Sequence, residues 1–490
     1  WSSDVCSSDL EMLHLERNLN MKRFLTEFSI NHPWMVIIGV VVITAFFATQ
    51  IPNIKIDTDP ENMLEKDEPV RIFDHQVKED FSIDDFIAVG VVDENGVFNK
   101  QILTNIHNIT AEVAEIDGVI ADDILAPSTV DDIVQDGGMM TVSTLMEDEP
   151  EDDERAQYIL GRIKDNPMFR GKLASDDGQA LAMYIPIESK DMSHRIAGEI
   201  QQIIDKYTAG EQYFIAGLPV AEDSFGTEMF KQMALGAPLA GLIIFLLMLM
   251  FFRDLRIVIS PMIVAVSSVF WALGLLILTG HTVHIMSSMI PIFLVPIAVL
   301  NSIHIISEFH DRYQKHKHKK TTIRNTVSKL FVPMLFTSIT TIIGFISLSL
   351  TPIPPVRVFG IFVAFGIFVA WFLSITFNPA FAVLISDKAL RNFGRSGEGH
   401  GLLSRIMHFF RDLTRRRYKG ILFGSAVIVV VAAVGLSLIV VNDNPVKWFK
   451  AGHPLRIADR TLNEHLAGTY MNYLVIEGEE EDALKDPETL

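Results

Sequence analysis

The chain has 490 residues, of which 49% are hydrophobic, and its mean hydropathy is +0.30. It also carries 60 acidic and 41 basic side chains, a formal net charge of −19. A soluble protein would spread its apolar residues at the period of helices or strands, whereas here they gather in runs long enough to cross a bilayer. The composition therefore excludes an ordinary soluble protein, and the single cysteine, Cys6, excludes disulfide frameworks and cysteine-ligated zinc.

The N-terminus begins with WSSDVCSSDL, which lacks an initiating methionine and nearly repeats itself. We interpret residues 1–20 as a non-native leader and Met21 as the natural start. The first apolar run has spanning length and no small-residue cleavage site, so a cleavable signal peptide is not expected.

Seven apolar runs of spanning length follow along the chain. In hydrocarbon only helices or closed barrels satisfy the backbone hydrogen bonds, and these runs are too long for barrel strands. The sequence therefore predicts an α-helical polytopic membrane protein. The expected spans cover residues 34–50, 234–252, 257–279, 283–309, 331–350, 358–386 and 420–441.

Lysine and arginine in the short connections predict the orientation of these spans. The basic clusters all fall on one side if the spans alternate, and that side is expected to be the cytoplasm. They are Lys22 and Arg23; Arg253 and Arg256; Arg312, Lys315, Lys317, Lys319, Lys320 and Arg324; and Arg411, Arg415, Arg416 and Arg417. We therefore expect an inner (plasma) membrane protein with a cytoplasmic N-terminus.

The expected domain organisation follows from the spans and their polar connections. The parts are the N-terminus and first span (21–51), a large extracytoplasmic domain (52–231), a five-span bundle (232–388), a basic cytoplasmic linker (389–419), the seventh span (420–441) and the start of a second extracytoplasmic domain (442–490).

The segment 52–231 contains 39 acidic and 14 basic residues, a net charge of −25, and is too polar to enter the bilayer. A strongly acidic face argues against nucleic acid as a partner. Its acidic cluster at 147–154 is expected to be a solvated loop rather than a cation site.

The pattern of this segment predicts an α+β domain. In chain order it predicts a strand at 85–92, a helix at 99–116, strands at 119–125 and 179–187, a helix at 194–207 and a strand at 212–216. The order βαββαβ is that of a ferredoxin-like, porter-type domain.

The sequence also contains an internal repeat. A shift of 385 residues (442 − 57) superposes Asp57 on Asn442 and Pro69 on Pro454, and the phrase EPVRIFD recurs as HPLRIAD. The seventh span therefore restarts the first. Because the second copy reaches Leu490 early in its own outer domain, we expect a protein truncated within the second repeat.

This layout resembles the resistance-nodulation-division (RND) superfamily of exporters. FIAGLPVAEDSF at 214–225 resembles the G-x-P element that enters the second span. The run at 337–381, with its PIPPVRVFG connection, resembles the fifth and sixth spans. The resemblance covers essentially all of the chain after Met21. It is nearest to the branch with MMPL-type lipid transporters and hopanoid exporters, and sterol-sensing proteins are more distant relatives.

The resemblance implies export driven by protons that enter through ionisable groups at mid-membrane. Family members usually place an aspartate in the fourth span, but the matching run VLNSIHIISEF has Asn301 at that position, which cannot titrate. His304 and Glu308 could form a substitute relay on one helix face. Hydroxyls on the fifth span are candidate partners: Thr337, Ser338, Thr340 and Thr341.

Structural roles for the same residues stay open. Glu308 would then lie among the lipid headgroups, and His304 would bond a neighbouring helix. The threonines would bond carbonyls one turn back in their own helix. The pair His281 and His284 lacks a third ligand and is expected to be solvated at the interface rather than to bind metal.

Two functions remain open at this stage. The first is proton-coupled export of lipid-like, hydrophobic or amphipathic molecules, with membrane lipid, the substrate and protons as partners and a homo-oligomer or periplasmic adaptor as a further possibility. The second is a non-transporting, sterol-sensing-like lipid-binding or regulatory module, which the neutral Asn301 favours. No motif of an enzyme is found, and no cofactor or metal is expected.

Overall fold

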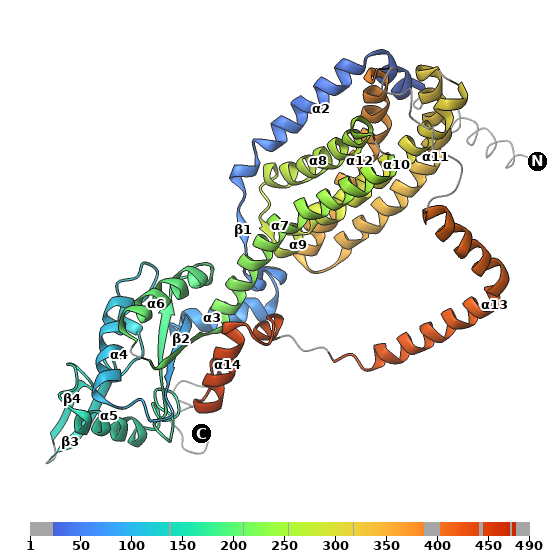
Figure 1. The fold of residues 1–490 in the computed structure, drawn as a ribbon. Coiled ribbons are helices and arrows are strands. Elements are labelled where there is room, and N and C mark those ends of the chain that lie inside the picture. Colours follow the sequence, from blue (N-terminus) through green and yellow to red (C-terminus); the bar gives the residue numbers. More distant parts are fainter. Residues whose placement is uncertain are drawn as a thin grey trace, which may run out of the picture.

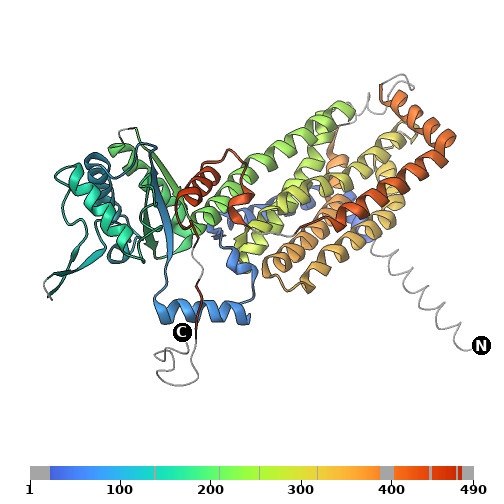
Figure 2. The same cartoon turned by 90° about the horizontal axis from the view of Figure 1, so that it is seen from below.

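The computed structural model describes residues 23–136, 139–208, 210–252, 254–316, 318–386, 402–440, 444–470 and 473–476. A bundle of long helices forms one part, and an α+β domain lies beyond one end of it (Figures 1 and 2). The predicted leader, Arg253, Asn442 and the first part of the linker between the sixth and seventh spans, residues 389–401, lie outside the described residues.

Seven helices in the described part are long and apolar enough to cross a membrane, as predicted. They are α2 (Pro33–Ala48), α7 (Leu218–Phe252), α8 (Leu255–Leu278), α10 (Ile290–His316), α11 (Lys319–Ile346), α12 (Pro354–Leu384) and α13 (Leu402–Ser437). Helix α12 is the most buried and lies at the centre of the bundle, whereas α13 stands apart from it in Figure 1.

The connections between these helices follow the expected alternation. At the end away from the α+β domain, Arg324 at the start of α11 pairs with Glu27, before α2, at 2.5 Å. At the same end, Nζ of Lys319 donates to the carbonyl of Ile385, after α12, at 2.5 Å. The segment before α2, the basic start of α11 and the end of α12 therefore share one end of the bundle. At the opposite end, α8 and α10 are joined through β7 (Val283–His284) and the short α9 (Ile285–Ser288). Also at that end, α11 and α12 are joined through the 3₁₀ turn η5 (Ser347–Leu350).

The α+β domain contains a three-stranded antiparallel sheet in the order β5-β2-β6. The strands are β2 (Asp85–Val92), β5 (Ala180–Ile187) and β6 (Gln212–Ala216), close to the predicted ranges. The helices α4 (Lys100–Val113) and α6 (Ser193–Tyr207) also lie where helices were predicted, and the short η4 (Lys190–Met192) precedes α6.

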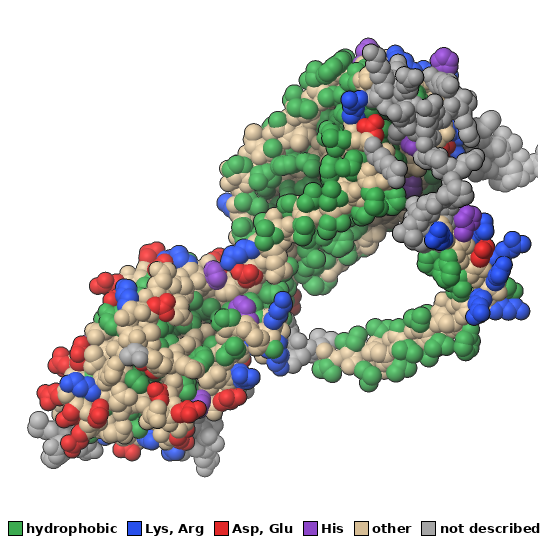
Figure 3. Space-filling view, viewed as in Figure 1, with side chains coloured by type: hydrophobic (Ala, Val, Ile, Leu, Met, Phe, Trp, Pro, Cys, Tyr) green, Lys and Arg blue, Asp and Glu red, His purple; other side chains and the backbone are tan. Residues whose placement is uncertain are grey.

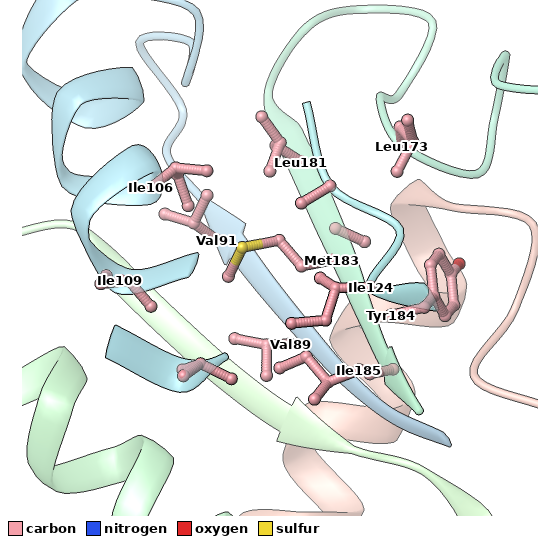
Figure 4. Close-up of a cluster of buried hydrophobic side chains, with 14 of the residues drawn as sticks. Val89, Val91, Ile106, Ile109, Ile124, Leu173, Leu181, Met183, Tyr184 and Ile185 are labelled. Carbon is pink, nitrogen blue, oxygen red and sulfur yellow. The ribbon is translucent and has the colours of Figure 1, made fainter. Parts of the chain in front are cut away.

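Alternation along the strands gives the sheet two buried faces. Val89 and its cross-strand partner Met183 face α4, where Met183 contacts the hydroxyl of Thr110, and Figure 4 shows them packed beside Ile106 and Ile109. All eight residues of β5 are buried, which is typical of a strand that is covered on both faces.

The predicted strand at 119–125 is wrong as a regular strand. A 3₁₀ turn, η3 (Ala121–Asp123), interrupts it, and only isolated antiparallel bridges join Val119 to Ile187 and Leu125 to Tyr184 at the edge of β5. Two further elements were not predicted: the hairpin of β3 (Asp131–Asp136) with β4 (Met139–Thr144), and the helix α5 (Asp153–Asp165).

The acidic cluster at 147–154 includes the N-cap and first residues of helix α5. Asp152 caps α5 by accepting a hydrogen bond from the backbone N–H of Arg155 at 2.9 Å, and Asp153 accepts from the N–H of Lys100 at 2.8 Å. Negative charge at a helix N-terminus is stabilised by the helix dipole. These carboxylates therefore serve local folding.

The sheet connects directly to the membrane bundle. Only Gly217 separates β6 from α7, and its φ of +129° belongs to the region that glycine adopts easily. A Cβ there would lie 2.9 Å from the carbonyl oxygen of Phe86. This tight turn lets the outer sheet continue into one helix of 35 residues.

The internal repeat is visible in the structure. After α2 the chain forms, in order, η1 (Ile51–Asn53), β1 (Ile56–Asp57), the 3₁₀ turn η2 (Pro60–Met63) and α3 (Pro69–Phe81). After α13, η7 (Pro445–Trp448) and α14 (Pro454–His465) appear at the same shift of 385 residues (454 − 69). Asp59 and Asn444 cap the two turns by accepting from the N–H groups of Glu61 and Val446.

An arginine fixes the turn to the helix in both copies. Arg71 donates to the carbonyl of Leu64 at 3.1 Å, and Arg456 donates to the carbonyl of Phe449 at 3.0 Å. The pairs differ by 385 residues at both ends (456 − 71 and 449 − 64). The repeat is therefore one of structure as well as sequence.

Candidate functional site

The predicted relay residues lie on α10, but they do not share one buried face. Asn301 is buried among the helices, with 6% of its surface exposed, whereas His304 is exposed on the surface of the bundle. No hydrogen bond of the His304 ring occurs within the described residues. The imidazole is therefore accessible on the outer surface of α10.

Glu308 is held by two cations. Its Oε1 accepts from Arg312 one turn along α10 and lies 2.9 Å from Nζ of Lys329 on α11. Both partners belong to the basic end of the bundle. Glu308 therefore lies in an ion-pair network at that end of the helices.

Three of the four candidate hydroxyls of the fifth span bond within their own helix, whereas the buried hydroxyl of Ser338 has no hydrogen-bond partner among the described residues. Thr337 donates to the carbonyl of Pro333 at 2.9 Å, and Thr340 and Thr341 donate to the carbonyl of Thr337 at 2.9 and 2.8 Å. Such bonds to carbonyls three or four residues earlier are the usual arrangement of threonine hydroxyls inside a helix. The structure does not bring these threonines into a hydrogen-bonded chain with His304 among the described residues.

A polar seam inside the bundle was missed by the sequence analysis. Ser260 on α8 donates to Oδ1 of Asn378 on α12 at 2.5 Å, and Ser302 on α10 and Ser374 on α12 have their hydroxyls 3.2 Å apart. All four side chains are buried. Small polar residues within apolar runs are the signal that could have located them, because such residues allow close approach and bond across helices.

A second polar cluster forms the joint between the outer domain and the bundle. Strand β1 pairs in parallel with β7, which places Asp57 beside His284. Next to this pair, the hydroxyl of Thr58 donates to Oδ1 of Asp223 on α7 at 3.0 Å. The joint therefore ties the segment after α2, the segment before α10 and the first turns of α7 together.

Helix α7 extends well beyond the membrane at this joint. Its 35 residues span about 50 Å at 1.5 Å per residue, whereas a hydrocarbon core is about 30 Å thick. The apolar run occupies residues 234–252, so the turns that carry Glu222 and Asp223 lie beyond it, outside the membrane.

Carboxylates outnumber cations in this joint. Nζ of Lys190 lies 3.6 Å from Glu61 and 3.9 Å from Asp85, and it also opposes the charge of Glu222. Burial nevertheless raises the pKa of Glu222 to about 7, helped by Asp59, Asp85 and Glu61. Burial also raises the pKa of Asp191 and of Asp223. Glu222 therefore exchanges a proton near neutral pH.

His284 is the buried imidazole of the same joint. It is 3% exposed, and neither ring nitrogen has hydrogen-bond geometry to a described atom. Burial lowers its pKa, against the opposing effect of Asp57 and Asp59. His281 instead lies 3.0 Å from the hydroxyl of Thr279 and against the ring of Phe362. Within the described residues there is no group of three His, Cys, Asp or Glu side chains that could hold a metal ion.

A cavity of about 490 Å³ opens beside the joint. It lies between α3, the start of β2, η4 and the segment that flanks α14. Its lining combines charged and aromatic side chains, including Asp74, Lys78, Asp85, Phe86, Lys190, Tyr470 and Tyr473. Such a lining suits an amphipathic molecule with a polar head, since pockets combine apolar surface with a few placed polar groups.

A nearby histidine–serine contact has no carboxylate hydrogen-bonded to the imidazole among the described residues. Nδ1 of His194 lies 2.9 Å from the hydroxyl of Ser224, but Asp223 accepts a hydrogen bond from the backbone N–H of His194 rather than from its ring. A carboxylate that orients the imidazole is part of the serine–histidine–aspartate arrangement. The contact therefore connects α6 to α7.

Comparison with known proteins assigns the family. Residues 100–417 match the model of the MMPL family, and this range includes most of the outer domain and six of the seven apolar helices in part or whole. The chain belongs to the MMPL family. This confirms the predicted RND-type relationship, and membership also agrees with the polytopic membrane fold.

The MMPL chain is also similar to a curated archaeal protein. The protein MJ1562 of Methanocaldococcus jannaschii, whose name describes it as a membrane protein, is 21% identical to this chain over 373 residues. The alignment covers 73% of this chain and 92% of that protein. The relative is therefore about as long as one repeat of the MMPL chain.

Proposed function

We propose that the chain acts in an RND-type secondary exporter that uses proton entry to move lipid-like, hydrophobic or amphipathic molecules on the outer side of the membrane. The observation that carries this proposal is α7, which runs without a break from the sheet of the outer domain through the bundle. A helix of this kind couples a shift among the membrane helices to the domain beside the 490 Å³ cavity. The ferredoxin-like, porter-type assignment of that domain belongs to this proposal.

The proton is proposed to load at two places. The first is Glu222 in the joint, which exchanges a proton near neutral pH on the outer side. The second is His304, an ionisable residue that is exposed on α10 and has no ion pair within the described residues. The other two predicted relay residues do not meet these conditions. Asn301 cannot titrate, and Glu308 is held by Lys329 and Arg312. The relay therefore rests on His304.

Reconstitution in liposomes tests the function. With a pH-sensitive dye inside the vesicles and a dye-labelled phospholipid as the transported probe, we expect lipid movement to depend on the pH gradient and His304→Ala to abolish the coupled proton flux. His318→Ala is the matched control, because His318 lies exposed before α11, outside the bundle. Coupled flux that survives His304→Ala would remove the relay.

The second candidate is a sterol-sensing-like lipid-binding module without transport. The observation that favours it is that Thr337, Thr340 and Thr341 donate their hydrogen bonds to carbonyls of their own helix. These hydroxyls therefore do not form a hydrogen-bonded path between Asn301 and His304. In this case the labelled lipid binds the protein, but a pH gradient moves neither lipid nor protons.

A further inference from the structure

The two equivalent helices α3 and α14 have different surroundings. They share a preceding 3₁₀ turn, a proline at the first helical position and an arginine that bonds back to the turn. Helix α14 packs on the sheet of the outer domain, whereas α3 has no buried residue. Two copies of one element therefore differ in whether their apolar face is covered.

The face of α14 covers the side of the sheet opposite α4 and α6. Its contacts are Leu455, Ala458, Leu462 and Leu466, which fall one or two turns apart on one side of the helix. Leu462 approaches the backbone of β2 so closely that a Cβ at Gly90 would lie 2.2 Å from its Cδ2. Gly90 thus provides the hollow that receives the helix.

The chain end after α14 secures this contact. The N–H of Ala467 donates to the carbonyl of Gly171 at 2.7 Å, and the hydroxyl of Tyr184 lies 3.4 Å from the carbonyl of Gly468. The sheet of the first repeat is therefore completed by a helix of the second repeat, as Figures 1 and 2 both show.

The shift of 385 residues maps each docking residue of α14 onto an apolar residue of α3. The equivalents are Val70, Phe73, Val77 and Phe81. Val70 is 69% exposed, Phe73 57% and Phe81 63%. Exposed apolar patches of this kind mark interaction sites in folded proteins.

We propose that α3 docks through this face on the sheet of a second outer domain of the same design, the one belonging to the repeat that α13 and α14 begin. The two repeats then exchange helices: α14 of the second covers the sheet of the first, and α3 of the first covers the sheet of the second. Each contact is the pseudo-symmetric counterpart of the other, as expected for an interface between duplicated units.

Other occupants fit the structure less well. In this chain α14 already covers the face of the sheet on which such a helix packs. The described residues therefore offer α3 no equivalent site. A membrane surface would favour basic residues around the apolar face, but the polar side of α3 includes Asp74, Glu79 and Asp80. The four side chains of α3 have the same spacing as the four of α14 that pack on the first sheet, so a second sheet of the same design fits them best.

Site-specific photo-crosslinking tests the exchange in a protein that carries the second repeat in full. A benzophenone side chain at Phe73 is expected to crosslink to the strands of the second outer domain. The same group at Ala458 is expected to crosslink to the first sheet, within residues 85–92 or 212–216, as the positive control. Placed at Glu79, on the polar side of α3, it should give at least tenfold less product.

The outcome at Phe73 decides the proposal. Crosslinks to peptides of the second sheet support it. Crosslinks that map only to lipid, to another protein or to the first repeat overturn it, as does a yield equal to that of the Glu79 control.

Paired substitutions give a second readout. Phe73→Ser with Phe81→Ser is expected to lower the unfolding temperature of the two-repeat protein and to leave that of the 490-residue chain unchanged, since both side chains are exposed there. Equal effects in the two proteins would overturn the exchange. Neither experiment involves transport, so its failure is distinct from a failure of the proposed function.

Discussion

Glu222 is the carboxylate of the joint whose ionisation is most opposed by its surroundings. Burial raises its pKa in the folded chain from the ordinary value of 4.5 to about 7. Between these values the folded chain binds more protons than the unfolded chain, so folding stability decreases as the pH rises from 4.5 to 7. The joint is therefore tighter at acidic than at neutral pH.

The substitution Glu222→Gln is expected to remove this component of the pH dependence. Unfolding temperatures measured from pH 5 to 8 should fall with pH in the wild type and fall less steeply in the variant. Glu228→Gln on the same helix is the control, because the partner Lys231 lowers the pKa of Glu228 and moves its titration below this window. Parallel profiles for wild type and Glu222→Gln would contradict the assignment.

The hydrogen bond between Ser260 and Asn378 gives a second residue-scale prediction. Ser260→Ala leaves the buried Oδ1 of Asn378 without its donor, and its Nδ2 already has no partner among the described residues. We expect a loss of about 1–3 kcal/mol in the free energy of unfolding, from the cost of an unsatisfied buried polar group.

A double-mutant cycle measures this contact. Ser260→Ala combined with Asn378→Leu should recover part of the loss, because it removes both polar partners. Strictly additive effects of the two substitutions would argue that the side chains do not interact.

Among the elements, the contact between α14 and β2 is the most specific. Gly90→Val would place side-chain atoms where Leu462 lies, so we expect α14 to separate from the sheet. Hydrogen exchange measured on residues 454–466 should then become faster. The added substitution Leu462→Ala should restore part of the protection, since it opens room for the valine, and no restoration would show that Gly90 acts in another way.

Elements with a regular period were predictable from the sequence, and interrupted ones were not. The strand predicted at 85–92 and the helix predicted at 194–207 follow from alternation and helical spacing, and the structure has them at Asp85–Val92 and Ser193–Tyr207. The strand at 119–125 failed because its acidic centre forms the turn η3, and bridges on either side replace a ladder. Helix α5 was missed because its acidic start was interpreted as a loop instead of a cap.

The candidate site was less predictable than the fold. Sequence position alone put Asn301, His304 and Glu308 on one helix face, but it did not show that Lys329 would hold Glu308 or that Asn301 would be buried and His304 exposed. The joint around Glu222 joins residues more than 160 positions apart, such as Thr58 and Asp223. No local pattern encodes such a contact.

At the scale of the whole molecule, surface chemistry divides the chain into two parts. Figure 3 shows hydrophobic side chains gathered over the bundle and acidic side chains over the outer domain. The basic connections lie at the far end of the bundle. This distribution supports an extracytoplasmic location for the outer domain.

Cysteine labelling in intact cells checks this orientation. In a Cys6→Ser background, a membrane-impermeant maleimide should label Asp122→Cys, on the exposed turn η3, without permeabilisation. Lys320→Cys, exposed at the start of α11, should be labelled only after permeabilisation. The reverse pattern would invert the topology.

The position of α14 has a consequence for biogenesis. About 240 residues separate the end of β6 from the helix that closes its sheet (454 − 216 = 238). During synthesis the ribosome must deliver the bundle and α13 to the membrane before residues 454–466 reach the other side. The first outer domain therefore waits half-assembled, with the backbone of Gly90 uncovered, until residues 454–466 arrive.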